Sequence, residues 1–438
     1  PAPSAPSHEA ATAARLQAVR RDPERLRLFL ADMPKGGDLH THLSGAVYAE
    51  TFIRLALEEG DCLATATMAI VAPPCDAAAH RVPMADAMSD TAQYGRLVDA
   101  LSMRNPQPGE NGHDRFFGTF ARFGPPGRRL GDMVAEGTSR AAHEHVSYLE
   151  VMITPDGGAA RMGATVGARA DLAAFREALL AAGLREQVVA ASRNAMDQAD
   201  ARRRQVQHCE TPLGDPGCQV EVRYIAQVSR SAPVEQVHAQ MVAWFELAQV
   251  DNRVAAVNLV QPEDAPLAMA GFDEHMRMLD YLHGVYPTVP VTLHAGELAD
   301  GMVPPEGLRR HIRDSIERGH ATRIGHGVDV AGEDQAEELL RDMARRRVAV
   351  EIALTSNDVI LGVRGARHPL RTYLRYGVPV MLATDDLGVS RSSHTREFVK
   401  AVEDQDLDYP TLKQMVRNSI EFAFVDAPTK ARLRRDLD

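Results

Sequence analysis

The sequence predicts an α/β protein, a (β/α)8 TIM barrel with an N-terminal helical extension and a helical insertion after the first strand. Eight short apolar segments alternate with helical patterns, as in a barrel of parallel strands that are each followed by a helix. Ionisable residues gather at the carboxyl ends of these segments, where such barrels carry their functional groups. A doubly wound open sheet also alternates strands and helices, but the count of eight and the placement of the polar residues favour the barrel.

Most of the expected strands are rich in Val, Ile or Leu, which is typical of strands buried on both faces. They span residues 37–43, 146–153, 220–228, 254–260, 289–294, 322–326, 348–353 and 378–384. The helical patterns between them cover residues 168–198, 233–250, 269–285, 306–318, 333–346 and 369–376. The polar residues at the strand ends are His40, His42, Glu150, His294, Glu297, His326, Glu351, residues 355–357, Asp385 and Asp386.

The chain divides into three parts. Residues 1–32 are expected to form a flexible leader and an N-terminal helix over 8–32, because apolar residues recur there at helical spacing among Ala, Arg and Glu. Residues 33–425 form the barrel, with an insertion at about 46–140 that holds helices near 46–59 and 84–103 and a polar loop at 105–114. Residues 426–438 form a C-terminal tail.

Composition excludes some classes of partner. The 438 residues are 45% hydrophobic, enough for a sizeable core, and carry a net charge of −11, which argues against binding a nucleic acid polymer. No run of 18 apolar residues is present, so we expect no membrane span. A small neutral ligand stays compatible with this composition.

The four cysteines form two local pairs. Residues 62 and 75, and residues 209 and 218, bracket loops that contain proline, so we expect the disulfides Cys62–Cys75 and Cys209–Cys218, although other pairings are formally possible. Disulfides persist in oxidising compartments. The Pro- and Ala-rich start of the chain resembles a leader that remains after signal-peptide removal. We therefore expect a periplasmic or secreted protein; the alternative is a cytosolic enzyme with four free thiols.

Three histidines and one aspartate form a candidate metal site. Alternate residues of a strand point to the same side, so His40 and His42 aim two imidazoles at one point. His294 at the end of the fifth strand and Asp385 after the eighth can converge with them. Nitrogen and oxygen ligands suit zinc (Zn2+), which lowers the pKa of a bound water toward about 7. Because no lysine that could bridge a second metal follows the fourth strand, we expect one zinc ion per chain.

Three further residues are candidates for proton transfer and substrate contact. Glu297 follows His294 across Ala-Gly, and a carboxyl kept protonated by burial there can act as a general acid. His326 lies between two glycines at the end of the sixth strand and can orient the attacking water or accept its proton. Asp386, beside the predicted ligand Asp385, is free to contact substrate.

Together these segments resemble the adenosine deaminase family of the amidohydrolase superfamily. The motifs are MPKGGDLHTHL at 33–43, LHAGE at 293–297, RIGHGV at 323–328, TSN at 355–357, TDD at 384–386 and RNSIEFAF at 417–424. The resemblance covers residues 33 to 425. The N-terminal helix, the early insertion and the cysteine pairs are similar to the secreted adenosine deaminase/growth-factor branch, which implies a possible homodimer.

The resemblance implies a role for each site residue. His40, His42, His294 and Asp385 would bind zinc, and Glu297 would protonate purine N1. His326 and Asp385 would position and deprotonate the attacking water, and Asp386 would hydrogen-bond N7. The reaction implied is the hydrolytic deamination of a purine nucleoside, adenosine or deoxyadenosine, to inosine or its deoxy form and ammonia.

Several positions depart from the family. Ser44 stands where the family usually has an aspartate that meets the ribose, and Gln261 lies where the family often has a glycine whose backbone meets the purine. Leu387 replaces the usual proline. We expect Ser44, Gly296, Gln261 and Asp386 to bind substrate. Two alternatives stay open: a deaminase of adenine or an N6-substituted adenine, and a secreted binding or signalling protein that retains the barrel without activity.

An aromatic cluster lies in the insertion. Phe116, Phe120 and Phe123 recur at helical spacing. They could form an apolar wall over a purine or simply the packing face of a helix.

Overall fold

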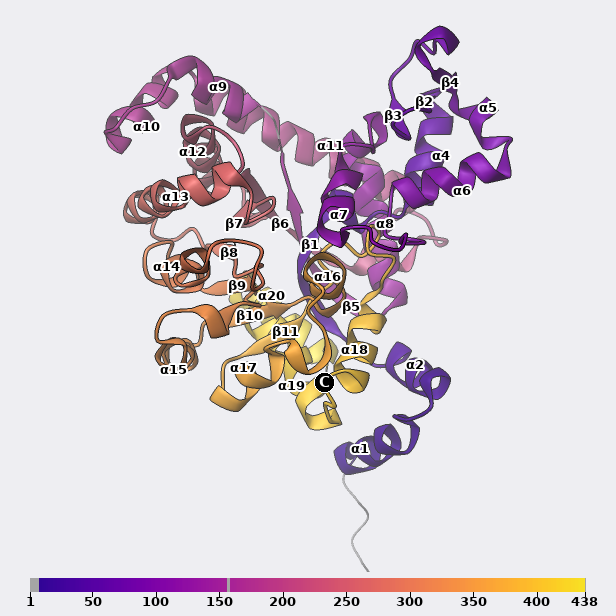
Figure 1. Cartoon of the computed structure of the whole chain (residues 1–438), viewed down its shortest axis with the longest axis vertical. Helices are drawn as coiled ribbons and strands as arrows, with labels where there is room; N and C mark the ends of the chain where they lie inside the picture. Colours follow the sequence, from indigo (N-terminus) through magenta and orange to yellow (C-terminus); the bar gives the residue numbers. More distant parts are fainter. Residues whose placement is uncertain (1–7, 156–157, 438) are drawn as a thin grey trace, which may run out of the picture.

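The computed structural model describes residues 8–155 and 158–437 (Figure 1), so the predicted leader at residues 1–7 lies outside the described residues. Eight parallel strands form two four-stranded sheets, ordered β1-β5-β6-β7 and β11-β10-β9-β8. The first sheet contains β1 (Gly36–His42), β5 (Val146–Ile153), β6 (Glu221–Ser229) and β7 (Val254–Val260). The second contains β8 (Thr292–Ala295), β9 (Arg323–His326), β10 (Ala349–Ile352) and β11 (Val380–Leu382).

Two parallel bridges join the sheets into a closed barrel. Val257 pairs with Val291 between β7 and β8, and Thr41 pairs with Asp385 between β1 and the end of β11. At the second junction the Asp385 N–H donates to the His40 carbonyl at 2.8 Å, and the His42 N–H donates to the Asp385 carbonyl at 3.0 Å. The predicted (β/α)8 fold is therefore confirmed, and its closure brings three predicted site residues side by side.

Helices surround the barrel strands (Figure 1). Those that follow β6 to β11 are α12 (Val234–Val250), α13 (Pro266–Val285), α14 (His311–Glu317), α15 (Ala336–Arg346), α16 (Leu354–Leu361), α17 (Leu370–Tyr376), α18 (His394–Glu403) and α19 (Tyr409–Glu421). The chain after β5 forms α9 (Gly158–Val166), α10 (Leu172–Ala181) and α11 (Ala190–Val206). The predicted C-terminal tail contains a further helix, α20 (Ala427–Leu437).

The N-terminal extension corrects one prediction. The single helix expected over 8–32 is wrong, because the structure has two helices there, α1 (His8–Val19) and α2 (Pro23–Ala31). Proline at the first position of α2 cannot donate a backbone hydrogen bond, and the side chain of Asp22 caps α2 by accepting from the Arg25 N–H at 3.1 Å. Asp22 and Pro23 therefore start a second helix, although apolar residues continue at helical spacing across the break.

Two other predicted helices are also divided. Residues 168–198 contain all of α10, a turn at Gly183 with φ +88°, a π-helical segment (Leu184–Val189) and the start of α11. Residues 84–103 contain α5 (Met84–Met88) and α6 (Thr91–Ala100), and Asp90 caps α6. Turn and capping residues therefore divide these two stretches, although their amino-acid composition is typical of continuous helices.

The insertion after β1 combines helices with a small antiparallel sheet that the sequence did not predict. After α3 (Leu43–Ala46) and α4 (Ala49–Glu59), strands β2 (Cys62–Ala64), β3 (Ala69–Val71) and β4 (Arg81–Pro83) pair in the order β3-β2-β4. Helix α7 (Gly112–Phe120) begins inside the predicted loop at 105–114, and α8 (Leu130–His143) leads into β5.

Both predicted disulfides are present. Cys62 and Cys75 tie β2 to the loop after β3, and Cys209 and Cys218 close the loop before β6, with Cα–Cα distances of 5.5 and 5.6 Å. These two bridges use all four cysteines of the sequence. The second bridge closes a loop whose residues are mostly exposed, with Leu213 at 90%.

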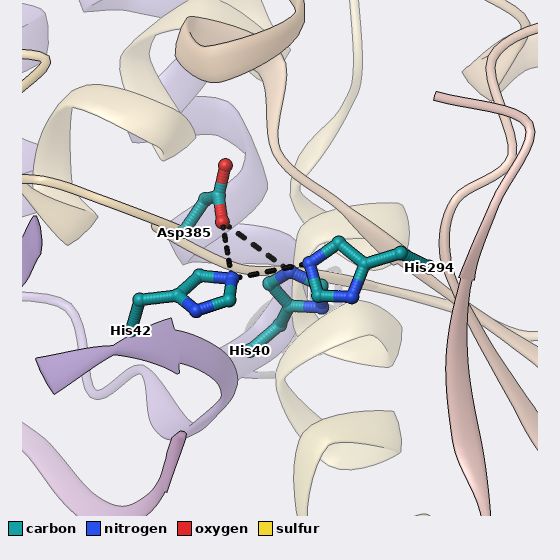
Figure 2. A group of neighbouring side chains, drawn as sticks. All are labelled: His40, His42, His294 and Asp385. Atoms are coloured by element: carbon teal, nitrogen blue, oxygen red, sulfur yellow. Dashed lines mark hydrogen bonds and ion pairs between the residues drawn. The ribbon is translucent and has the colours of Figure 1, made fainter. Parts of the chain in front are cut away.

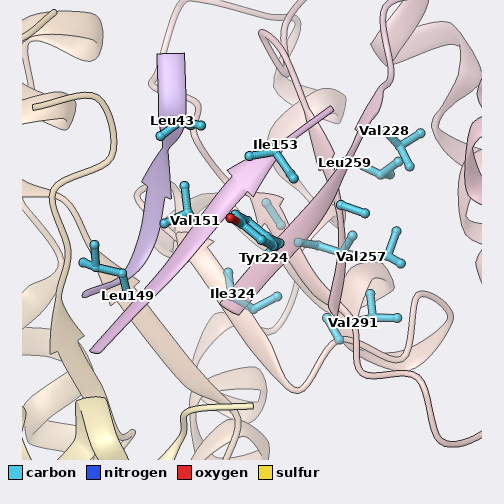
Figure 3. Close-up of a cluster of buried hydrophobic side chains, with 14 of the residues drawn as sticks. Leu43, Leu149, Val151, Ile153, Tyr224, Val228, Val257, Leu259, Val291 and Ile324 are labelled. Atoms are coloured by element: carbon cyan, nitrogen blue, oxygen red, sulfur yellow. The ribbon is translucent and has the colours of Figure 1, made fainter. Parts of the chain in front are cut away.

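The core fixes the strand ends that carry the site (Figure 3). Side chains from α3, β5, β6, β7 and β9 and Val291 before β8 pack together there, and each labelled side chain is at most 5% exposed. Burial of apolar surface at about 25 cal/mol per Å2 stabilises this packing and holds neighbouring strands in register. Within residues 8–155 and 158–437, no helix combines the length and the apolar character needed to cross a membrane.

Candidate active site

Four predicted metal ligands meet at the carboxyl ends of β1, β8 and β11 (Figure 2). One ligand atom from each of His40, His42, His294 and Asp385 lies within 4.8 Å of all the others. The Nε2 atoms of His42 and His294 are 3.1 Å apart, and Oδ1 of Asp385 lies 3.3 Å from His40 Nε2 and 3.4 Å from His42 Nε2. The four side chains therefore converge on one point from three strands.

The opposite nitrogen of each histidine ring is held by a polar partner. Nδ1 of His40 donates to the Glu351 carboxylate at 2.6 Å, and Nδ1 of His42 donates to Gln227 Oε1 at 2.5 Å. Nδ1 of His294 donates to Asn258 Oδ1 at 3.0 Å, and Asn258 also accepts from the His294 backbone N–H. Such outer contacts orient metal-ligating imidazoles and fix their tautomers.

This arrangement fits a divalent metal ion. With Nδ1 protonated, the facing Nε2 atoms of His42 and His294 both present lone pairs, and burial lowers the pKa of both rings below the usual value. His40 Nε2 and Asp385 Oδ1 are buried atoms without a hydrogen-bond partner in the described chain. Zinc–nitrogen bonds of about 2.0–2.1 Å in a tetrahedral site would separate ligand atoms by about 3.3 Å. The donor set and its spacing therefore suit a metal ion with nitrogen and oxygen ligands.

Asp385 is positioned by its backbone as well as its side chain. Its φ is +57°, a conformation that non-glycine residues adopt rarely, and the bridge to Thr41 holds it there. Ser356 on α16 donates to Oδ2 at 2.6 Å, which leaves Oδ1 for the centre. Burial favours the neutral carboxyl, but the close His40 imidazole and the other neighbouring histidines bring the pKa of Asp385 well below its usual range.

Glu297 lies beside this group with a carboxyl suited to carrying a proton. Its side chain is buried, Oε1 has no hydrogen-bond partner in the described chain, and Oε1 is 3.6 Å from His326 Nε2. Burial and the nearby Asp385 carboxylate raise the pKa of Glu297 well above its usual value. The Glu297 backbone N–H donates to Glu263 Oε2 at 2.8 Å, which fixes the turn after β8.

His326 ends β9 with φ +69° and is fully buried. Asn357 Nδ2 donates to its Nδ1 at 3.0 Å. Its Nε2 therefore faces Glu297 and Asp385, whose ligand atoms lie within 4.8 Å of one another and of the ring.

A cavity of about 270 Å3 opens beside the metal ligands. Its lining includes apolar side chains from the insertion, from the end of β7 and from α16. The lining residues are His42, Ser44, Phe116, Phe117, Phe120, Gln227, Ser229, Val260, Gln261, Pro262, His294, Glu297, Ile360, Asp385 and Asp386. The volume lies just below the range of about 300–1,000 Å3 that is common for small-molecule sites.

The aromatic cluster has two parts. Phe116, Phe117 and Phe120 of α7 line the cavity, whereas Phe123 is buried and stacks on Phe52 with ring centroids 4.4 Å apart. Phe116 and Phe120 therefore form the expected apolar wall, whereas Phe123 packs in the core.

Three of the four predicted substrate contacts reach the cavity. Ser44, Gln261 and Asp386 line it. Gln261 has φ +82°, and its side-chain Oε1 accepts from the Ser231 N–H at 3.1 Å. Burial and the adjacent Asp385 raise the pKa of Asp386 well above its usual value.

Gly296 lies outside the cavity lining. Its N–H donates to Glu263 Oε1 at 3.2 Å, and its carbonyl accepts from Val328 and Asp329. With φ +72° it provides the sharp turn between His294 and Glu297.

Sequence reasoning did not identify Gln227 or His368. Gln227 supports His42, and His368 donates to Asn357 at 3.0 Å. A polar side chain near the end of an apolar strand could have pointed to Gln227. His368 carries no comparable signal, because it lies in a loop beyond α16.

Known proteins share both the sequence and the fold. The adenosine deaminase family model matches residues 129–438. An adenosine deaminase of Enterococcus faecalis is 31% identical over 152 residues, which is 34% of this chain and 42% of that protein. One from Escherichia coli is 38% identical over 145 residues, which is 33% of this chain and 40% of that protein. The matched segments therefore span less than half of these relatives.

Solved structures resemble the whole chain at low identity. A Burkholderia ambifaria amidohydrolase with bound Zn has a TM-score of 0.58 at 20% identity, covering 94% of this chain and 91% of that one. An Arthrobacter aurescens adenine deaminase has a TM-score of 0.55 at 18% identity, covering 92% and 98%. These likenesses support the fold, whereas the family match covers most of the chain. The chain belongs to the adenosine deaminase family.

Proposed function

We propose that the protein is a zinc-dependent hydrolase that deaminates a 6-aminopurine nucleoside, adenosine or deoxyadenosine. The observation that carries the proposal is the position of Glu297. A buried carboxyl with a raised pKa and an unpaired oxygen lies beside four convergent metal-ligand side chains and opens onto a small apolar cavity. Hydrolysis at an amidine carbon needs this combination of a nucleophile site and a proton donor.

Each residue has a task that follows from its contacts. His40, His42, His294 and Asp385 would hold the zinc ion, which when bound supplies Lewis acidity that makes water nucleophilic at neutral pH. Glu297 donates its proton to purine N1 as the water oxygen bonds to C6. The C6–N6 bond then breaks, and the amino group leaves as ammonia with the proton that the water has lost. The remaining C6 hydroxyl proton passes to the Glu297 carboxylate as the C6 carbonyl forms. Asp386, kept neutral by burial, can donate to N7.

The cavity favours an uncharged ligand. The acidic residues that line it are Glu297, Asp385 and Asp386, and its described lining contains neither lysine nor arginine. Phosphate groups are bound by such cations in proteins. The proposal is therefore a nucleoside or free base as substrate rather than a nucleotide.

Ser44 motivates the first alternative, a deaminase of adenine or of an N6-substituted adenine. Its short hydroxyl lines the cavity where the family usually presents a carboxylate to ribose. An adenine deaminase is among the proteins with a similar fold. The second alternative, a secreted binding or signalling protein, requires that the metal group and Glu297 serve no reaction.

One experiment separates these possibilities. Release of ammonia from adenosine, deoxyadenosine, adenine and AMP, and of methylamine from N6-methyladenosine, is measured together with zinc content for the natural protein and for Glu297→Gln. We expect about one zinc ion per chain and a 10²–10⁴-fold loss of rate in Glu297→Gln, the usual contribution of a general acid. Exposed Glu306→Gln is the matched control. If adenosine is among the poorest substrates, the nucleoside assignment fails; a metal-free or Glu297-indifferent protein supports the binding alternative.

We also propose an exported location, periplasmic or secreted. The two disulfides support it, because reducing compartments disfavour such bridges. Alkylation of the protein within its native cells should find all four cysteines oxidised, and four alkylated thiols would contradict the proposal. The homodimer stays a prediction, for which light scattering is the test.

A further inference from the structure

A directed chain of hydrogen bonds runs from α17 to His326. It begins at the Leu370 backbone N–H, a group that can only donate, which donates to His368 Nδ1 at 3.2 Å. His368 Nδ1 is therefore an acceptor, and the ring proton lies on Nε2, which donates to Asn357 Oδ1 at 3.0 Å. The Asn357 amide is thereby oriented with Nδ2 toward His326 Nδ1, to which it donates at 3.0 Å.

This series of hydrogen-bonded side chains is isolated from solvent. His368, Asn357 and His326 are 3%, 0% and 0% exposed, so water cannot replace any of these partners without a rearrangement. Burial, with Lys400 as a smaller cause, lowers the pKa of His368 to about 4 and keeps that ring neutral. Each hydrogen bond therefore has one direction, set by the backbone amide at its start.

We propose that His368 and Asn357 are positioning residues that hold His326 with its proton on Nε2, so that His326 presents an N–H donor to the reacting water. The inference rests on the proposed deaminase function. It decides between the two roles that the sequence left open for His326, orientation of the water or acceptance of its proton. Because every hydrogen bond in the series has a fixed direction, His326 is assigned the role of orienting the water.

Proton acceptance then falls to Asp385. Ser356, the residue before Asn357 on α16, donates to Asp385 Oδ2, so Oδ1 is the carboxylate oxygen without a partner in the described chain. The water O–H bond breaks toward the Asp385 carboxylate while the water oxygen bonds to C6 and Glu297 protonates N1. The proton on Asp385 later leaves with ammonia, and the C6 hydroxyl proton returns to Glu297. Two adjacent residues of one helix thus fix the donor and the acceptor that face the water.

Asn357→Asp is the direct test, because it keeps the shape of the side chain and replaces the Nδ2 donor with an oxygen that accepts. The proton of His326 should move to Nδ1, as nitrogen-15 NMR of histidine-labelled enzyme can report. We expect kcat to fall by at least about 100-fold, in line with the cost of a wrong histidine tautomer. KM and zinc content should stay within about threefold, and a loss of structure would instead change all three.

Two His368 variants test the hydrogen bond that His368 donates to Asn357. His368→Gln retains an amide that can donate to Asn357 Oδ1 and should restore most of the activity that His368→Leu loses. His275 is also buried but does not belong to this series of hydrogen bonds. His275→Leu is therefore the control for loss of a core imidazole and should leave the His326 tautomer unchanged.

The outcomes separate this inference from the proposed function. A wild-type NMR spectrum with the proton of His326 on Nδ1, or wild-type kcat in Asn357→Asp, overturns the inference while deamination stands. Absence of deamination across the whole substrate panel overturns the proposed function, and the spectrum still reports whether Asn357 sets the tautomer.

Discussion

Gly45 and Asp386 lie so close that a Cβ atom on residue 45 would be 1.5 Å from Oδ1 of Asp386. Atoms at that distance overlap, so no side chain at position 45 is compatible with the present place of Asp386. The two residues belong to α3 and to the loop after β11, and Gly45 also accepts backbone hydrogen bonds from Gly388 and Val389 through its carbonyl. The glycine after Ser44 therefore makes room for a cavity-lining carboxyl.

Gly45→Ala should displace Asp386 without disturbing the metal ligands. We expect kcat/KM to fall by about 10–100-fold, the value of one hydrogen bond that involves a strongly polar group, at unchanged zinc content. Steady-state kinetics and metal analysis measure both. Gly284→Ala, where the added Cβ meets nothing within 4 Å, is the control. Wild-type kcat/KM in Gly45→Ala would show that Asp386 does not contact substrate.

Gln227 should contribute to metal affinity. Its Oε1 accepts from His42 Nδ1 at 2.5 Å, and its Nε2 donates to Thr154 at 3.1 Å, so its orientation is fixed. Gln227→Leu frees the His42 ring, and loss of such an outer contact typically weakens metal binding by about 10–100-fold. Competition with a chelator measures the affinity. Gln249→Leu on the surface is the control, and equal affinity in Gln227→Leu would contradict the role.

An ion pair connects α7, which carries the aromatic wall, to the loop after β7. His113 of α7 and Asp264 after β7 lie with Nε2 and Oδ1 3.1 Å apart. His113→Ala should let α7 move and raise KM several-fold with a smaller change in kcat. Asp264→Asn should give the same result, whereas an unchanged KM in both variants would exclude a part for the pair in substrate binding.

The same pair should show a defined pH dependence. The hydrogen bond to Asp264 is the largest cause that raises the pKa of His113 to about 9, above its ordinary value near 6.5. A raised histidine pKa stabilises the fold fully below about pH 6.5, and this contribution is lost as the pH rises through about 9. The difference in unfolding free energy between the natural protein and His113→Ala should follow that curve. A pH-independent difference would contradict it.

Asp329 should make the fold less stable as the pH rises. Both of its carboxylate oxygens are buried without a hydrogen-bond partner in the described residues. Burial, then Glu263 and Glu333, raise the pKa of Asp329 to about 9. Because the folded chain keeps this proton between about pH 4 and 9 and the unfolded chain does not, stability falls across that window, by at most about 1.4 kcal/mol per pH unit.

Asp329→Asn removes that titration. In urea unfolding, the variant should gain stability relative to the natural protein from pH 5 to pH 9, and exposed Asp334→Asn should not. Parallel pH profiles for the natural protein and Asp329→Asn would contradict the buried neutral carboxyl.

The sequence predicted those features that depend on strand periodicity. The strands at 146–153 and 254–260 have the predicted bounds, because apolar runs between turn signals define them locally. The convergence of His40, His294 and Asp385 was also predictable, because parallel strands of a barrel end at the same face.

Features set by distant contacts were not predictable. Strands β2, β3 and β4 have three residues each, too few for an alternating pattern, and they form by pairing with one another. The support of His42 by Gln227 joins residues 185 positions apart. Only the closed barrel brings such pairs into contact.

Closure of the barrel between Thr41 and Asp385 has a consequence for how the chain acquires its metal. These residues are 344 positions apart, so their bridge is among the contacts with the longest loop to close during folding. Asp385 can join His40 and His42 only after the first and last strands have met. Full metal affinity should therefore arise late, when synthesis of the last strand is complete, and a nascent chain that ends before it should hold the ion only weakly.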